Sequence, residues 1–252
     1  MNPIHFSTLK LMGRSPLHAK FSLDGGQGES TSSKLIGTAA HTLALGTGQR
    51  VVTYEGRRDM RTKAYQEFLA ENKDAVILNA AEFAKASGMA RSLEKNRGAM
   101  RYLAGIREVP MEWEWLGRRC ATRGIDAVDS GVPGEIRFLT ELKTTKFAKP
   151  EWFTTEVVRR GYAEQLCFYE NAVGVPVPEL VIVAVESSPP HPVVVYVLSR
   201  RMRDQAERRL RLWMEQFLSC ERSDSWPGYV ETVIEMDTPD ELSLDWGDDE
   251  AA

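Results

Sequence analysis

The chain has 252 residues, 42% hydrophobic and 27% charged, with a formal net charge of −4 at pH 7. These values are ordinary for a globular protein with a buried core. No apolar run is long enough to cross a bilayer, and the N-terminus lacks the apolar stretch of a signal peptide, so neither membrane attachment nor secretion is expected. Widely spaced cysteines without a CxxC pair argue against a disulfide framework and a zinc ribbon, and they favour a reducing cytoplasm.

Acidic residues are concentrated at the C-terminal end. Residues 231–252 hold nine Asp or Glu and no Lys or Arg, which leaves 32 basic and 27 acidic residues, a net charge of +5, in the first 230. A mildly basic body is compatible with a nucleic-acid substrate, because phosphate binding requires local positive charge. We expect one domain over residues 1–230 and a solubilising, flexible acidic tail over residues 231–252.

The N-terminal part, residues 1–105, is expected to be mostly helical, and no strand is predicted in it. A first turn capped by Ser7 is predicted over residues 7–12, and the Gly/Ser-rich stretch 24–33 predicts a loop. Segments rich in Ala, Leu, Glu, Lys and Arg predict further helices at 35–45, 62–71, 80–87 and 90–103. Gly46 ends the first of these helices.

Residues 106–222 are expected to form an α/β core. The polar/apolar alternation of residues 108–116 is typical of a half-buried strand. Behind it the pattern predicts strands over 119–128 and 136–143 joined by a turn at 130–134, a long helix over 152–173, paired strands over 180–186 and 193–198, and an arginine-rich helix over 199–220. This order predicts a mixed central sheet with helices on both faces.

Two carboxylates and one ammonium group have a spacing that suits a divalent-metal site. Glu141 and Lys143 are two residues apart on a predicted strand, so their side chains point to the same face. Asp126 lies on the preceding strand, which can pair with this one through a short turn. Two converging carboxylates repel each other unless a cation lies between them, and oxygen ligands favour Mg²⁺ or Mn²⁺.

Each of these residues also has a purely structural interpretation. Asp126 is alternatively a strand-end acid, with Asp129 as a competing acid in the turn, and Glu141 with Lys143 is alternatively a surface ion pair. Unpaired charge on a central strand is costly, which favours function for that pair. His41 on an Ala/Leu helix is, taken alone, more typical of a core histidine than of a ligand.

The ordered motifs resemble those of the PD-(D/E)xK nuclease superfamily, in the branch of RecB-like and RecE-like exonucleases. The segments that carry the resemblance are Gly37–His41, Gly124–Asp126, Glu141–Lys143, Gly161–Tyr169 and Arg57–Lys63 with Arg14–Pro16. Two departures are that the acid before x-Lys is Glu, which the pattern permits, and that no proline precedes Asp126. The cysteine cluster of some relatives and a helicase motif are both missing, so no iron–sulfur cluster is expected.

The resemblance implies a fold and a set of site residues. The fold is a restriction-endonuclease-like core. Asp126, Glu141 and the backbone carbonyl of Leu142 hold Mg²⁺, for which Mn²⁺ can substitute, while His41 completes or shares the site and Lys143 orients the attacking water.

Several further residues have supporting roles by the same resemblance. Gln165 and Tyr169 form a Q-x-x-x-Y helix motif, although their i,i+4 spacing is equally compatible with a structural role. Glu108 is a weaker candidate for the metal shell. Candidates for phosphate contacts, for which a solvated charge run is the alternative, are Arg57, Arg58, Arg61, Lys63, Arg159 and Arg160.

The resemblance further implies degradation of linear double-stranded DNA from its ends, 5′ to 3′. The resulting 3′ overhangs would serve a single-strand annealing protein in a phage-type recombination system, inside a bacterial or phage-infected cell. A ring-shaped homo-oligomer is implied as well. Two alternatives stay open: a structure-specific or single-strand nuclease of the same superfamily, and a non-catalytic DNA-binding subunit.

Overall fold

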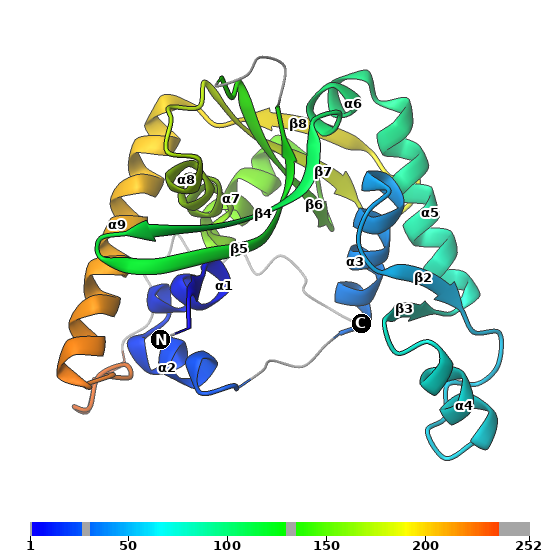
Figure 1. Cartoon of the computed structure of the whole chain (residues 1–252), viewed down its shortest axis with the longest axis horizontal. Coiled ribbons are helices and arrows are strands. Elements are labelled where there is room, and N and C mark those ends of the chain that lie inside the picture. The colour runs from blue at the N-terminus through cyan, green and yellow to red at the C-terminus, as the bar shows by residue number, and fades with distance from the viewer. Residues whose placement is uncertain (1, 27–30, 130–134, 237–252) are drawn as a thin grey trace.

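A mixed six-stranded sheet is the centre of the molecule (Figure 1). The computed structural model describes residues 2–26, 31–129 and 135–236. Strands follow the order β1-β5-β6-β7-β8, with β4 paired to β5. Their bounds are β1 Ile4–His5, β4 Ile106–Trp115, β5 Arg118–Val128, β6 Phe138–Thr145, β7 Glu179–Glu186 and β8 Val193–Val197.

The pairing directions make this sheet mixed, as the sequence predicts. β4, β5 and β6 pair antiparallel in succession, β6 and β7 run parallel, and β8 returns antiparallel to β7. Side chains alternate between the two faces: Leu180 and Ile182 of β7 belong to one hydrophobic cluster, Val181 and Val183 to the other. A strand buried on both faces explains the continuous apolar run of β7.

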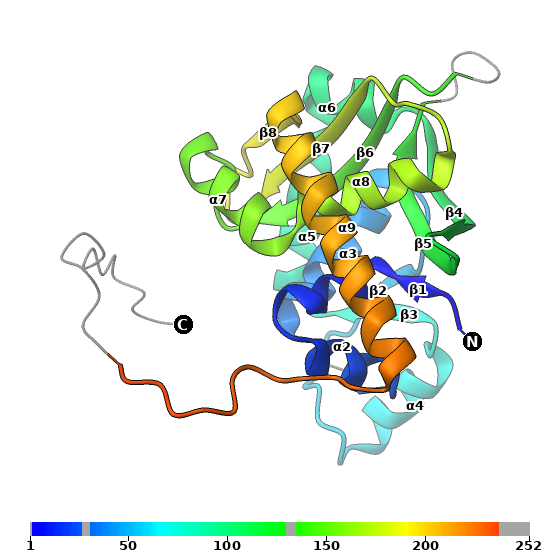
Figure 2. The same cartoon turned by 90° about the vertical axis from the view of Figure 1, so that its left-hand side faces the viewer.

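Helices cover both faces of the sheet. The first hydrophobic cluster, which includes Leu180 and Ile182, is filled by the rings of Phe6, Phe153, Phe168 and Phe217. The long helix α9 lies beside α8 on this face (Figure 2). The helices on this side are α1 Phe6–Leu9, α7 Pro150–Arg160, α8 Tyr162–Val173 and α9 Arg200–Ser223, with the 3₁₀ turn η1 Lys10–Gly13 and α2 Pro16–Leu23 near the start of the chain. The other face packs against α3 Ser32–Leu45, α5 Ala80–Lys95 and α6 Arg97–Leu103.

The N-terminal part is mostly helical but also contains two short strands, which corrects the expectation that it has none. Arg50–Thr53 (β2) and Ala75–Leu78 (β3) form a parallel two-stranded sheet, and Lys63–Glu71 (α4) connects them. Both strands are four residues long, and tertiary packing of Val76 and Leu78 against the second cluster stabilises them. Runs this short are ambiguous between strand and helix when only periodicity is available.

Three helix boundaries also differ from the prediction. The first helix follows His5 without a side-chain cap, so Ser7 is not its cap, and α2 was not predicted. α5 continues through residue 88 and ends at Lys95, and the side chain of the next residue, Asn96, caps α6. The predicted turn at 130–134, part of the loop at 24–33 and most of the acidic tail lie outside the described residues. Among the residues described, no helix is both long and apolar enough to cross a membrane.

The predicted long helix over 152–173 is two helices. Gly161 separates α7 from α8 with a φ of +71°, in the left-handed region that glycine adopts most readily.

We expect Gly161→Ala to lower the free energy of unfolding by about 1 kcal/mol, because a Cβ makes this conformation unfavourable. Urea unfolding checks this, with Thr154→Ala at an exposed position of α7 as a control for local sensitivity. An unchanged unfolding midpoint would contradict the proposed need for glycine.

Candidate active site

The site lies where one edge of β5 changes its partner. β5 pairs with β1 near its start and with β6 only at Ala127 and Val128. Asp126 is the next residue along this edge, and its Oδ2 accepts a hydrogen bond of 2.7 Å from the Leu142 N–H of β6. A carboxylate thus replaces a backbone partner, and this fixes Asp126 beside the acid-x-Lys segment.

Glu141 and Lys143 of β6 share a hydrogen-bonded network with α8. Lys143 Nζ donates to Glu141 Oε1 at 2.7 Å and to Gln165 Oε1 at 3.0 Å. Gln165 Nε2 donates to Glu141 Oε1 and to the Tyr169 hydroxyl, both at 2.7 Å. An ammonium group only donates hydrogen bonds and a carboxylate only accepts them. The Gln165 amide therefore has one orientation, with its oxygen toward Lys143 and its nitrogen toward Glu141. The Q-x-x-x-Y spacing therefore orients the acid and the lysine.

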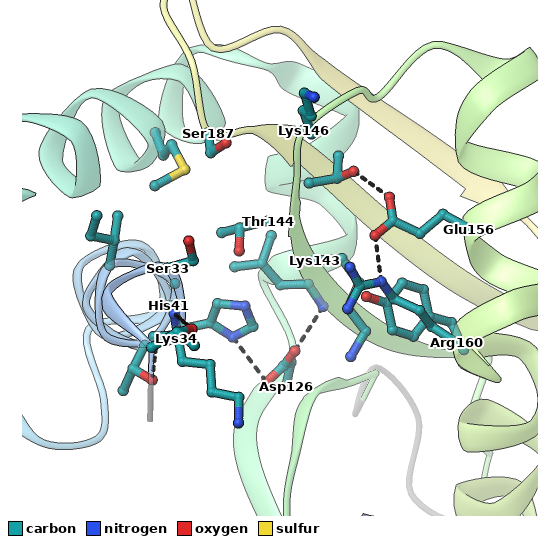
Figure 3. Close-up of a pocket in the computed structure, with 18 of the residues that line it drawn as sticks. Ser33, Lys34, His41, Asp126, Lys143, Thr144, Lys146, Glu156, Arg160 and Ser187 are labelled. Carbon is teal, nitrogen blue, oxygen red and sulfur yellow. Dashed lines mark hydrogen bonds and ion pairs between the residues drawn. The ribbon is translucent and has the colours of Figure 1, made fainter. Parts of the chain in front are cut away.

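His41 reaches the site from the opposite face of the sheet. It extends from α3, and its Nδ1 lies 3.7 Å from Asp126 Oδ1 (Figure 3). The glycine at the start of the Gly37–His41 motif permits this approach, since a Cβ at Gly37 would lie 3.0 Å from Thr144 Oγ1. All six side chains predicted for catalysis or metal binding, and the Leu142 backbone, are thus in one cluster.

The surroundings of the two carboxylates in this cluster shift their pKa values in opposite directions. Burial, followed by repulsion from Asp126, raises the pKa of Glu141 to about 7. Burial also acts to raise the pKa of Asp126, but His41, Lys143 and the Leu142 N–H hold that pKa below its ordinary value. Burial opposes the charge of Lys143 as well, yet Glu141 and Asp126 keep its pKa above the ordinary value. Lys143 is therefore an ammonium group at neutral pH.

The donors present fit a divalent cation. The second oxygen of Glu141, Oε2, is buried and has no hydrogen-bond partner among the described residues. Leu142 directs its N–H toward Asp126, and in an extended strand the C=O of the same residue lies on the same edge. Nowhere in the described ranges do three His, Cys, Asp or Glu side chains form a ready-made metal cluster. A cation would relieve the repulsion between the carboxylates of Asp126 and Glu141, and Glu141 Oε2 would be free to bind it as a ligand.

A cleft of about 1750 Å³ opens over the cluster, between α3, the end of β6 and α7. Seven Lys or Arg and four Asp or Glu line it, so its walls carry excess positive charge. Besides the cluster, these charged residues are Lys34, Lys85, Glu108, Arg123, Lys146, Glu151, Glu156, Arg159 and Arg160.

The predicted phosphate contacts divide into two groups. Arg159 and Arg160 line the cleft; Arg160 is paired with Glu156 at 2.6 Å, whereas Arg159 has no ion pair within the described part of the chain. The other four, near α4, do not line it. Three of them form ion pairs elsewhere, Arg58 with Glu82, Arg61 with Asp59 and Lys63 with Glu67, and Arg57 is exposed. DNA contact by these four stays a prediction.

Two residues have contacts that the sequence reasoning underrated. The Lys143 ammonium lies over the ring of Tyr162, 4.6 Å from its centroid, and Tyr162 directly follows the helix-breaking Gly161. Glu108 lines the cleft with a left-handed φ of +48°, and a Cβ at Gly124 would lie only 3.2 Å from the Glu108 backbone. Residues other than glycine with a left-handed φ are concentrated at functional sites. This indication of a role for Glu108 comes from the structure and could not be read from the sequence.

The sequence matches the family described as a PDDEXK-like domain of unknown function (DUF3799) over residues 5–237. The chain belongs to this family. The PDDEXK-like assignment confirms the resemblance and the fold class predicted from the sequence. A comparison with curated proteins found no match.

One solved structure shares the fold of this chain over most of its length. A crystal structure from Eubacterium rectale, of a protein provisionally named an exonuclease, superposes with a TM-score of 0.66 at 16% identity, covering 97% of this chain and 93% of that one. SSO0001 matches with a TM-score of 0.34 at 14% identity (81% and 84% covered), and LHK-Exo in complex with dAMP with 0.30 at 12% (77% and 96%). The last two scores are too low to support an argument.

The raised pKa of Glu141 predicts how stability depends on pH without metal. The folded chain holds the Glu141 proton up to about pH 7, whereas the unfolded chain releases it near 4.5. The free energy of unfolding should therefore fall between these values, by up to roughly 3 kcal/mol, and then level off. Unfolding in EDTA from pH 4.5 to 8 measures this, and Glu141→Gln should flatten the slope. Equal slopes in both proteins would contradict the assignment.

Proposed function

We propose that this PDDEXK-like protein is a divalent-metal-dependent deoxyribonuclease that acts as an exonuclease on linear double-stranded DNA. One observation carries the proposal: Asp126, Glu141 and Lys143 lie in one cluster beside a cleft with basic walls, and Glu141 Oε2 is buried there without a hydrogen-bond partner among the described residues. Membership of a PDDEXK-like family supports a nuclease of this superfamily.

Asp126, Glu141 and the Leu142 carbonyl would hold Mg²⁺ or Mn²⁺, with His41 beside Asp126. When bound, the cation lowers the pKa of a coordinated water and neutralises charge on the phosphate in the transition state. Lys143 stays charged between Glu141 and Asp126, and its ammonium is suited to orient the attacking water and to stabilise the hydroxide. Gln165 fixes the Lys143 and Glu141 side chains in this position.

The cleft supports a nucleic-acid substrate. The positively charged groups along its walls suit a phosphate backbone, which binds largely through Lys and Arg side chains. Arg159 is the first candidate for such a contact, because it lines the cleft without an ion pair among the described residues. We further propose that digestion runs 5′ to 3′, that a ring-shaped homo-oligomer encloses the duplex, and that an annealing protein receives the 3′ overhang.

Duplex DNA labelled separately at each end tests the activity and its direction. With Mg²⁺, a 5′ label should be released first as short products, while a 3′ label at the same end should stay on long strands. Closed circular duplex should resist, because it has no ends. Rapid cutting of circles would instead favour a structure-specific nuclease, and a preference for single strands would favour the single-strand alternative. No cleavage of any DNA with Mg²⁺ or Mn²⁺ would contradict the enzyme. The molecular mass of the native assembly, measured with and without DNA, tests the ring-shaped oligomer.

A further inference from the structure

Two exposed aromatic side chains stand at the mouth of the catalytic cleft. Trp152 is 63% exposed and Phe147 is 45% exposed, and both line the cleft that contains Asp126 and Lys143. Their rings lie 5.8 Å apart between centroids, tilted by 41°. Tryptophan side chains are on average highly buried, so a largely exposed one beside an active site calls for a functional explanation.

The helical period explains why Trp152 is directed away from the core. Phe153 and Val157, four residues apart on α7, are buried in the first hydrophobic cluster. Trp152 and Arg159 belong to the neighbouring face of the same helix, which lines the cleft. The core contacts of α7 thus fix the direction of Trp152, and this aromatic side chain shares a wall with a guanidinium group.

The turn between β6 and α7 holds Phe147 equally firmly. Thr145 Oγ1 lies 3.3 Å from the Phe147 N–H and 3.2 Å from its carbonyl oxygen, in hydrogen-bonding position. Ala148, the next residue, is fully buried, and its N–H donates to Glu186 at 2.8 Å. The aromatic pair is therefore presented by an anchored backbone, so little conformational entropy is lost when a ligand stacks on it.

The surrounding charge indicates which ligand fits. Lys146 Nζ lies 5.3 Å from the Phe147 ring centroid, and Arg159 lines the same wall. Aromatic side chains interleaved with cations in a basic groove are the arrangement that binds single-stranded nucleic acid, with bases on the rings and phosphates on the cations. A protein partner that used these aromatics would have to enter the cleft beside the catalytic lysine.

We propose that Phe147 and Trp152 form a stacking platform for an unpaired nucleobase of the substrate. This inference rests on the proposed nuclease and adds a substrate feature to it: the protein holds a few unpaired nucleotides next to the scissile phosphate. Phe147 follows Lys143 by four residues, which span at most ~14 Å of extended chain. The stacked base therefore lies within the first few nucleotides from the cleavage position.

Fluorescence of 2-aminopurine tests the platform without any cleavage. Single-stranded oligonucleotides carrying the probe at successive positions from the end are added to the full chain in EDTA. Quenching should peak when the probe is a few nucleotides from the end. Trp152→Ala should remove this maximum and weaken oligonucleotide binding by roughly 5- to 150-fold, the usual range for loss of one stacked base. Trp152→Phe should restore most of both.

Phe21 supplies the matched control. It is an aromatic residue of α2 that is 64% exposed and does not line the cleft, so Phe21→Ala should leave quenching and binding unchanged. Equal quenching in Trp152→Ala and the unaltered chain would overturn the platform, and so would equal losses in Phe21→Ala. The two proposals fail separately. Normal cleavage without Trp152-dependent stacking rejects the platform alone, and Trp152-dependent stacking without cleavage in Mg²⁺ or Mn²⁺ rejects the nuclease alone.

Discussion

Lys143→Ala should reduce Mg²⁺-dependent DNA cleavage by at least about 10²–10³-fold, the usual effect of removing a group that stabilises charge in the transition state. The reason is that Lys143 is the ammonium held between Glu141 and Asp126, and no neutral side chain orients and stabilises a hydroxide in the same way. DNA binding should be largely retained, because the other cations lining the cleft are unchanged. Initial rates on end-labelled duplex, with gel-shift binding in EDTA, measure both.

Lys85→Ala is the matched control for this variant. Lys85 lines the same cleft from α5 but belongs to the other side of the site, so its loss should change cleavage only slightly. Because Lys143→Ala leaves two buried carboxylates without their partner, its thermal unfolding must be compared with that of the unaltered chain. Substantial activity in a folded Lys143→Ala protein, equal to that of Lys85→Ala, would reject the role of Lys143.

Asp126→Asn and Glu141→Gln should each abolish stabilisation of the fold by divalent cations. In the unaltered chain, Mg²⁺ or Mn²⁺ at 100 times its dissociation constant should add about 2.7 kcal/mol to the free energy of unfolding. Each substitution removes one charged oxygen ligand, so the increment should fall toward zero and cleavage should be lost with it. Thermal unfolding with and without metal measures the increment directly.

Asp129→Asn is the control that separates the two candidate acids. Asp129 pairs with Arg137, whose Nη2 donates to Asp129 Oδ1 at 3.1 Å, so its loss should lower stability without metal. The increment caused by Mg²⁺ should nevertheless persist. If Asp129→Asn lost that increment and Asp126→Asn kept it, the assignment of the first metal carboxylate would be wrong.

The sequence was sufficient to predict that several candidate site residues lie together. An acid and a lysine two residues apart on a strand must share a face, and Glu141 with Lys143 does so because strand geometry is local. The Gln165–Tyr169 spacing was equally readable, since helical neighbours at i,i+4 meet. What local reasoning could not provide is the edge of β5, where the partner changes from β1 to β6 and the Asp126 carboxylate bonds to the Leu142 N–H.

Long-range contacts explain the errors as well. β2 and β3 pair although 21 residues separate the end of one from the start of the other, and neither has a pattern long enough to distinguish strand from helix. The break at Gly161 depends on a left-handed φ that the amphipathic period did not reveal. Near α4, the pairing of Arg58 with Glu82, 24 residues along the chain, is a contact that only the fold determines, whereas the pairs Arg61–Asp59 and Lys63–Glu67 are local, and DNA contact by these residues stays a prediction.

A Mn²⁺ anomalous difference map of the crystallised chain tests the central claim most directly. The account predicts one strong peak in contact with the carboxylates of both Asp126 and Glu141, which disappears in Glu141→Gln crystals treated identically. A map without a peak there at saturating Mn²⁺, or an ion bound only by other residues, would contradict the metal site and the proposed nuclease that depends on it.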